Sequence, residues 1–76
     1  MADEPLDLTW INRLGSELGL DPLDQAQVDA LLRIAADAAH DSGDRRNAPM
    51  ACFLTGLRLG RDGTDPTPAH LLGGTA

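Results

Sequence analysis

The chain has 76 residues, enough for one small domain whose single hydrophobic core only narrowly outweighs the entropy of ordering the backbone. Hydrophobic residues make up 42% of it, but Trp10 and Phe53 are its only aromatic residues, so the core must be aliphatic, which favours packed helices over a sheet. The net charge of −6 repels nucleic-acid backbones and anionic membrane surfaces, which argues against both as partners.

Cysteine content and hydropathy indicate a cytoplasmic protein. Cys52 is the only cysteine and cannot form a disulfide within the chain, as is typical of proteins in a reducing compartment. The N-terminus has no basic start followed by an apolar run, and no stretch approaches the roughly 18 apolar residues that span a bilayer.

A first helix is predicted over residues 8–18. Its apolar residues recur at the three-to-four spacing of an amphipathic helix, at Trp10, Ile11, Leu14 and Leu18. Its start is either capped by Asp7 or has Pro5 in the first helical turn, and Gly19 stands where the helix would end. Gly15 in its interior costs about 1 kcal/mol relative to alanine. That glycine is either simply tolerated or a sign that another helix approaches closely there, and we favour the close approach.

A second helix is predicted over residues 25–41. Asp24 and Gln27 have the spacing of a capping box, the clearest helix start in the chain. Its apolar stripe contains Val28, Leu31, Leu32, Ala35, Ala38 and Ala39. Because alanines dominate the second half of this stripe, a neighbouring helix can approach closely there. Gly43 is the expected C-terminal stop.

A third helix is predicted over residues 48–59. Asn47 is its predicted N-cap, and Pro49 occupies the first turn, where a missing amide hydrogen is harmless. Gly60 is expected to end it. The stripe predicted to face inward contains Met50, Phe53, Leu54 and Leu57.

The remaining residues, 61–76, mix Gly, Pro, Thr and Asp without a sustained period and are predicted to form a flexible tail. Within it, His70, Leu71 and Leu72 could dock weakly. The sequence thus predicts an all-α fold, a small three-helix bundle formed by a single domain over residues 1–60. Structural roles within it are expected for Trp10, Pro49, Phe53 and Gly56.

A polar stretch, HDSGDRRNAP at residues 40–49, separates the second and third predicted helices. It precedes a helix N-terminus, where free amide hydrogens and the positive end of the helix dipole attract phosphates and carboxylates. We predict a binding corner there, formed by His40, Arg45, Arg46 and Asn47. The ordinary alternative is that both arginines pair with Asp41 and Asp44 and otherwise face water.

Other chemistry is less well supported. A metal site needs three or four converging ligands, and His40, Cys52 and His70 fit no known ligand spacing. A nucleophile such as Ser42 or Cys52 needs an oriented base inside a pocket, which so short a chain can hardly enclose. We therefore expect no catalytic residue, no metal and no cofactor.

An acyl or peptidyl carrier is a further alternative, because such carriers are also short, acidic and helical. Their modified serine stands at the start of a helix and precedes an apolar residue. Here Ser42 precedes Gly43 and is predicted to lie at the end of a helix, so its position is opposite to that of a carrier serine.

Three segments, LTWINRLGSELGL, LLRIAADAAH and RRNAPMACFLTGLRLG, together resemble a short actinobacterial domain of unknown function over residues 8–60. The residues that match its pattern are Trp10, Ala39, His40, Ala48, Pro49, Phe53, Leu54, Gly56 and Leu57. Either Arg45 or Arg46 takes the place of that domain's arginine. The domain occurs alone or as a C-terminal extension of molybdenum cofactor guanylyltransferase-like proteins. The resemblance implies an accessory association with molybdenum cofactor biosynthesis and no activity.

Three hypotheses about function follow. The first is a non-catalytic module that binds a protein partner, such as a nucleotidyltransferase or a molybdoenzyme maturation factor, through the predicted corner. The second makes the same corner a pocket for a phosphate-bearing molecule such as a guanine nucleotide or a pterin. The third is a homodimer built on the alanine-rich face of the second helix, which would add buried surface to a small core.

Overall fold

The described part of the fold is built from helices alone. The computed structural model describes residues 6–73, and this range contains four helices and no strand. Their bounds are α1 (Thr9–Glu17), α2 (Gln25–Ser42), α3 (Asn47–Asp62) and α4 (Pro68–Gly73). The predicted all-α class is confirmed. None of the helices in this range combines the length and hydropathy needed to cross a membrane.

Local side-chain chemistry fixes both ends of α2. The Gln27 N–H donates to the Asp24 carboxylate at 2.8 Å, and the Asp24 N–H donates to the Gln27 side-chain oxygen at 2.9 Å. This is the predicted capping box. At the other end Gly43 adopts a φ of 74°, in the left-handed region that favours glycine. Both predicted signals are confirmed.

The predicted ends of α3 are wrong. Asn47 is the first residue of α3, not its cap. The N-cap is Arg46, without a side-chain cap hydrogen bond, and its own N–H donates to the Asp44 carboxylate at 2.9 Å. At the far end, α3 continues through Gly60 and stops before Gly63, whose φ is 67°. Gly63 ends α3 because it adopts the left-handed conformation, whereas Gly60 keeps a helical conformation and is tolerated inside the helix.

The helix α4 lies in the segment predicted to be a tail, and it is docked. Its first turn is capped by Thr67, whose side-chain oxygen accepts the His70 N–H at 3.2 Å, while Pro68 takes the first helical position. Leu71 is buried, with 6% of its surface exposed. The tail prediction therefore fails for α4, because one leucine in a capped turn is enough to anchor it. The ends of the predicted ranges, residues 1–5 and 74–76, lie outside the described residues.

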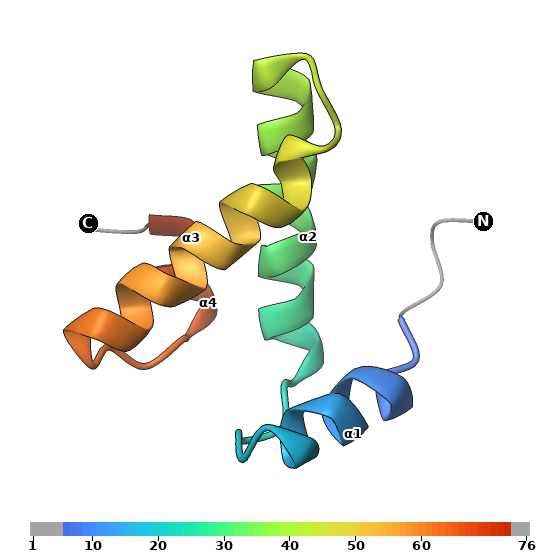
Figure 1. Cartoon of the computed structure of the whole chain (residues 1–76), viewed down its shortest axis with the longest axis vertical. Coiled ribbons are helices and arrows are strands. Elements are labelled where there is room, and N and C mark those ends of the chain that lie inside the picture. The colour runs from blue at the N-terminus through green and yellow to red at the C-terminus, as the bar shows by residue number, and fades with distance from the viewer. Residues whose placement is uncertain (1–5, 74–76) are drawn as a thin grey trace.

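The core lies where α2, α3 and α4 meet (Figure 1). One buried residue from each helix forms its centre, namely Ala30, Leu59 and Leu71, and Leu31 and Ile34 pack against them. A small helical bundle is confirmed. Its three packed helices are α2, α3 and α4, so α4 takes the place predicted for the helix over residues 8–18.

Helix α1 stands apart from this bundle, at the N-terminal end of α2 (Figure 1). Within residues 6–73, no residue of α1 comes within 8 Å, Cα to Cα, of another helix. The Asn12 side chain instead clamps the backbone of Leu23, accepting its N–H at 2.8 Å and donating to its carbonyl at 3.2 Å. Trp10, for which a structural role is predicted, is 64% exposed in this chain.

The turn after α1 explains Gly19, and it involves Gly15 only through its carbonyl. Gly19 has a φ of 75°, and the Leu20 N–H donates to the Gly15 carbonyl at 2.8 Å, which together form a Schellman motif. The predicted close approach of a helix at Gly15 is wrong. A Cβ placed on Gly15 would meet only the Asp21 carbonyl oxygen, at 3.9 Å.

Helix α3 presents its small residues to α2. Cys52 is half-buried and its thiol donates to the Leu31 carbonyl at 3.6 Å, while Ala51 and Ala38 line one groove between the two helices. The helix that lies against this side of α2 is thus α3 of the same chain. This face of α2 is correspondingly less available to a second copy.

The predicted inward stripe of α3 is consequently wrong. Its four residues face solvent, with exposed fractions of 56% for Met50, 66% for Phe53, 61% for Leu54 and 56% for Leu57. Pro49 and Gly56, expected in structural roles, are exposed as well. The physical reason is that small side chains let the two helix backbones approach closely, which the large stripe would prevent.

Candidate functional site

Two surfaces concern function: the elbow, defined as residues 40–49 between α2 and α3, and the outer face of α3. In the elbow, Asp44 organises the loop. Its carboxylate accepts the Arg46 N–H and forms a forked ion pair with the Arg46 guanidinium, at 3.0 Å from Nε and 2.6 Å from Nη2. The Ser42 hydroxyl bonds the Asp44 backbone on both sides, at 3.2 Å each.

This pairing changes the electrostatics of the predicted corner. The Arg46 guanidinium lowers the pKa of Asp44 below its ordinary 3.8. The ionised Asp44 carboxylate occupies the guanidinium group that an anion would otherwise use. The amides that could receive an anion are also engaged, since the Asn47 and Ala48 N–H groups donate to the carbonyls of Asp44 and Arg45 at 3.0 and 3.1 Å.

The four predicted corner residues are not joined into one site. His40 is exposed in the last turn of α2, and Arg45 is exposed in the loop. Within residues 6–73 no hydrogen bond connects His40 to Arg45, Arg46 or Asn47. Arg46 pairs with Asp44, as the ordinary alternative anticipated for that arginine. The elbow therefore carries exposed charge around a loop that satisfies its own polar groups.

Ser42 and Cys52, the two side chains considered as nucleophiles, have no activating partner among the described residues. Ser42 is the last residue of α2 and bonds only the Asp44 backbone, an arrangement opposite to that of a carrier serine. Burial raises the pKa of the Cys52 thiol, which keeps it protonated. No three metal-binding side chains converge anywhere in residues 6–73.

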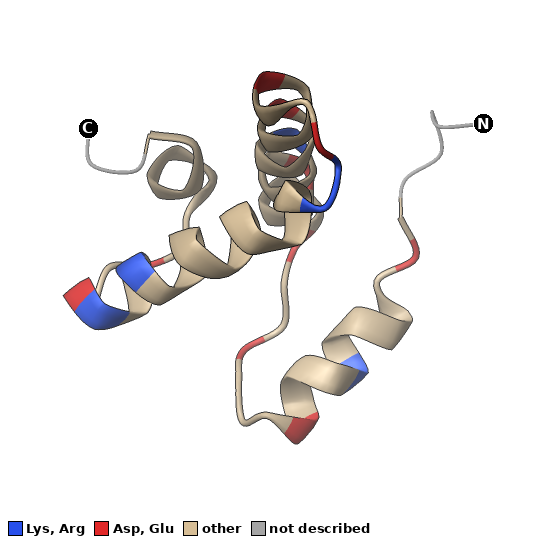
Figure 2. Ribbon diagram, turned by 45° about the horizontal axis from the view of Figure 1, so that its top comes forward, with Lys and Arg blue, Asp and Glu red and all other residues tan. Residues whose placement is uncertain are grey.

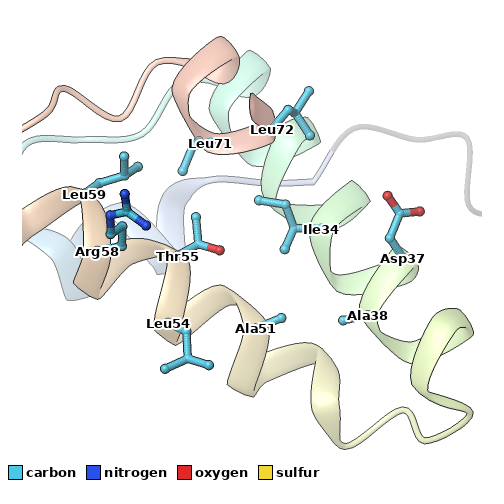
Figure 3. A pocket seen from close by; sticks show the side chains of 10 residues that line it. All are labelled: Ile34, Asp37, Ala38, Ala51, Leu54, Thr55, Arg58, Leu59, Leu71 and Leu72. Atoms are coloured by element: carbon cyan, nitrogen blue, oxygen red, sulfur yellow. The ribbon is translucent and has the colours of Figure 1, made fainter. Parts of the chain in front are cut away.

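A groove of about 430 Å³ lies between α2, α3 and α4 (Figure 3). Ile34 and Leu71 point into it, and Leu54 is among the residues that line it. At its rim Arg58 bonds Asp62 at 2.8 Å, which lowers the pKa of that carboxyl. The groove was not predicted because one of its walls is α4. It is an apolar seam between packed helices whose rim charges are already paired.

The outer face of α3 is the largest feature that sequence reasoning missed. We define it by its four exposed large side chains, Met50, Phe53, Leu54 and Leu57. No residue from Asn47 to Leu57 is charged, and the arginines lie at the two ends of the helix (Figure 2). The signal was a second stripe at helical spacing that contains only small side chains and one leucine: Ala48, Ala51, Cys52, Thr55 and Leu59.

Fold and surfaces together define a small all-α domain without an assembled catalytic or metal centre among its described residues. Residues 2–74 match the family described as Domain of unknown function (DUF6457), and the chain belongs to that family. The match includes both α1 and α4, so the helix outside the bundle is part of the family domain. No curated protein and no solved structure matches the chain.

Proposed function

We propose that this domain is a non-catalytic interaction module that binds a protein through the outer face of α3. One observation carries the proposal: four large apolar side chains of α3 face solvent, while Cys52 and Leu59 are the residues that face the other helices. A monomeric protein rarely exposes so contiguous an apolar patch unless something covers it. Absence of charge from Asn47 to Leu57 supports a protein partner, since interface cores are depleted of charged residues.

The elbow fits this proposal as a charged rim. Arg45, Arg46 and His40 are exposed at the N-terminal end of the face, and Arg58 and Arg61 lie at its other end. Rim charges contribute to the rate and orientation of association more than to its strength. We therefore assign the elbow to orienting the partner and the apolar face to holding it.

The resemblance to extensions of molybdenum cofactor guanylyltransferase-like proteins supports one class of partner. On that basis we propose an accessory role beside a nucleotidyltransferase of cofactor biosynthesis. A titration of the purified domain against such an enzyme tests this choice of partner, with an Arg45→Ala and Arg46→Ala double variant alongside. Weaker or slower binding by the double variant supports the role of the elbow, and equal binding removes it.

The contact itself is tested by photocrosslinking from the outer face. Benzoylphenylalanine replaces Phe53 in the intact chain, in cells that produce it, and a matched copy carries the same group at Leu32. Leu32 is an exposed leucine of α2, with 55% of its surface accessible, and it lies outside the face. The proposal predicts a covalent protein adduct from position 53 and none from position 32. Illumination without an adduct from position 53 contradicts it.

A further inference from the structure

A second unpartnered apolar surface lies on α1 and the turn that follows it. Between them is a cup of about 170 Å³ whose wall is almost entirely apolar. Its apolar lining consists of Ile11, Leu14, Leu18, Leu20 and Leu23. Leu18 and Leu20 are each 63% exposed, so the cup is open to an occupant. A cavity of roughly 150 Å³ accommodates a benzene ring, so the cup has room for an aromatic side chain.

The chain cannot fill this cup with its own α3. The Asn12 clamp on Leu23 and the Schellman turn at Gly19 hold α1 at the N-terminal end of α2. Helix α3 begins at the opposite end of α2 (Figure 1). Within residues 6–73 no other helix comes within 8 Å of α1, Cα to Cα, so none of those helices fills the cup, and we look to another molecule for its occupant.

Charge favours a second copy as that molecule. Residues 6–24, which contain α1, carry four acidic residues and one arginine. Residues 44–62, which contain α3, carry four arginines and two aspartates. The two segments thus have opposite net charge although the chain as a whole is acidic. Complementary potentials of this kind align two surfaces as they meet.

The exposure of both surfaces agrees with this choice. Leu14, Leu18 and Leu20 of the cup and the four residues of the outer face of α3 are all large hydrophobic residues exposed in one chain. A reciprocal contact, in which each copy gives its α1 cup and receives the other's α3 face, covers both surfaces at once.

We propose that two copies of this chain form a symmetric dimer in which Phe53 of each copy inserts into the α1 cup of the other. The inference rests on the proposed function, because it names the protein that covers the outer face of α3. Phe53 is the aromatic residue of that face and its most exposed one, at 66%. Aromatic side chains in fitted pockets dominate binding energy at interfaces.

Sedimentation equilibrium over a concentration series tests the dimer with three variants of the full chain. Phe53→Ser removes the inserted ring and Leu18→Ser damages the cup. Leu32→Ser is the matched control, an exposed leucine outside both surfaces. Each of the first two raises the dimer dissociation constant at least about 100-fold, since each damages the contact twice. The control leaves it within about threefold, as expected for an exposed position outside the contact.

Mixing the two damaged chains is the sharper test. The intact Phe53 of the Leu18→Ser chain meets the intact cup of the Phe53→Ser chain, so an equimolar mixture regains one of the two contacts. The mixture should therefore associate more tightly than either variant alone. No gain on mixing overturns the pairing of Phe53 with the cup. Circular dichroism of each variant checks that α-helix content is unchanged.

The results also separate this inference from the proposed function. If the wild type is a monomer at every concentration while position 53 still crosslinks to another protein in cells, the second copy is excluded and the interaction module survives. If position 53 crosslinks to nothing, both proposals fail. A dimer that Phe53→Ser does not weaken overturns this inference alone.

Discussion

The two outermost helices, α1 and α4, are held to α2 in opposite ways. Helix α4 has six residues, but it buries Leu71 against α2 and α3. Helix α1 has nine residues and a clear apolar stripe, but among the described residues it has no buried one and is held by the side chain of Asn12 and a glycine turn. An amphipathic pattern therefore shows that a helix has an apolar face to bury. The pattern does not show against which surface that face is buried.

Truncating Leu71 should have the largest effect on the folded chain. Leu71→Ala leaves a cavity at the meeting point of three helices and should cost about 3 kcal/mol of stability. In a domain of this size that lowers Tm by more than about 10 °C. Leu72→Ala is the control, because Leu72 is 47% exposed. Thermal unfolding with equal losses for both variants would contradict the docking of α4.

Removing the clamp should loosen α1 without melting the bundle. Asn12→Ala deletes two hydrogen bonds to Leu23 and should cost about 1 to 2 kcal/mol. A helix of nine residues is too short to persist by itself, so α1 should fray. Hydrogen exchange reads this directly: amides of α1 lose protection while those of α2 keep theirs. Simultaneous loss in both helices would show that α1 is part of the bundle.

Gly15 inside α1 and Gly19 in the turn after α1 should respond in opposite directions to substitution by alanine. Gly19→Ala forces a left-handed residue to carry a Cβ and should cost about 1 kcal/mol. The added Cβ of Gly15→Ala would lie 3.9 Å from the Asp21 carbonyl oxygen, an ordinary contact. Because alanine favours a helix interior, this variant should gain up to about 1 kcal/mol of stability. Urea unfolding at equal concentrations of both variants measures the difference. A destabilising Gly15→Ala would restore the hypothesis that another helix packs there.

Acid should affect the start of α1, and only modestly. The Thr9 N–H donates to the Asp7 carboxylate, and this bond lowers the pKa of Asp7 below its ordinary 3.8. Since the pKa is lower in the folded state, the stabilisation is complete at neutral pH and is lost as the pH falls below that ordinary value. Asp7→Asn should flatten the pH dependence of Thr9 amide protection. An unchanged profile would show that Asp7 does not cap α1.

Local chemistry made much of the fold predictable. The Asp24 and Gln27 pair and Gly43 fix the ends of α2 through neighbours in the sequence, and the structure contains both signals. The start of α4 had such a signal too, in Thr67 followed by Pro68, but the surrounding Gly and Pro content outweighed it. Where a helix begins is decided within a few residues, so sequence can reveal it.

Which face of α3 turns inward was not predictable in the same way. Helix α3 has one stripe of large side chains and one of small ones, and the alanines of α2 favour close approach by the small one. That choice depends on two helices at once. The polar groups of the elbow were unpredictable for a similar reason. Asp44 accepts the Arg46 N–H and also forms an ion pair with the Arg46 guanidinium, and the sequence does not show which partner each group will choose.

Trp10 lies outside the cup but shares its neighbour Leu14 with it, so it can report on the central claim that the apolar face of α1 is uncovered in one chain and covered by a second. It is the only tryptophan, and it is 64% exposed. We predict red-shifted emission and strong acrylamide quenching at low protein concentration, with a blue shift and protection as the concentration rises. Phe53→Ser should stay red-shifted throughout. Emission that is already blue in the most dilute wild-type sample, or that never changes, would contradict the account.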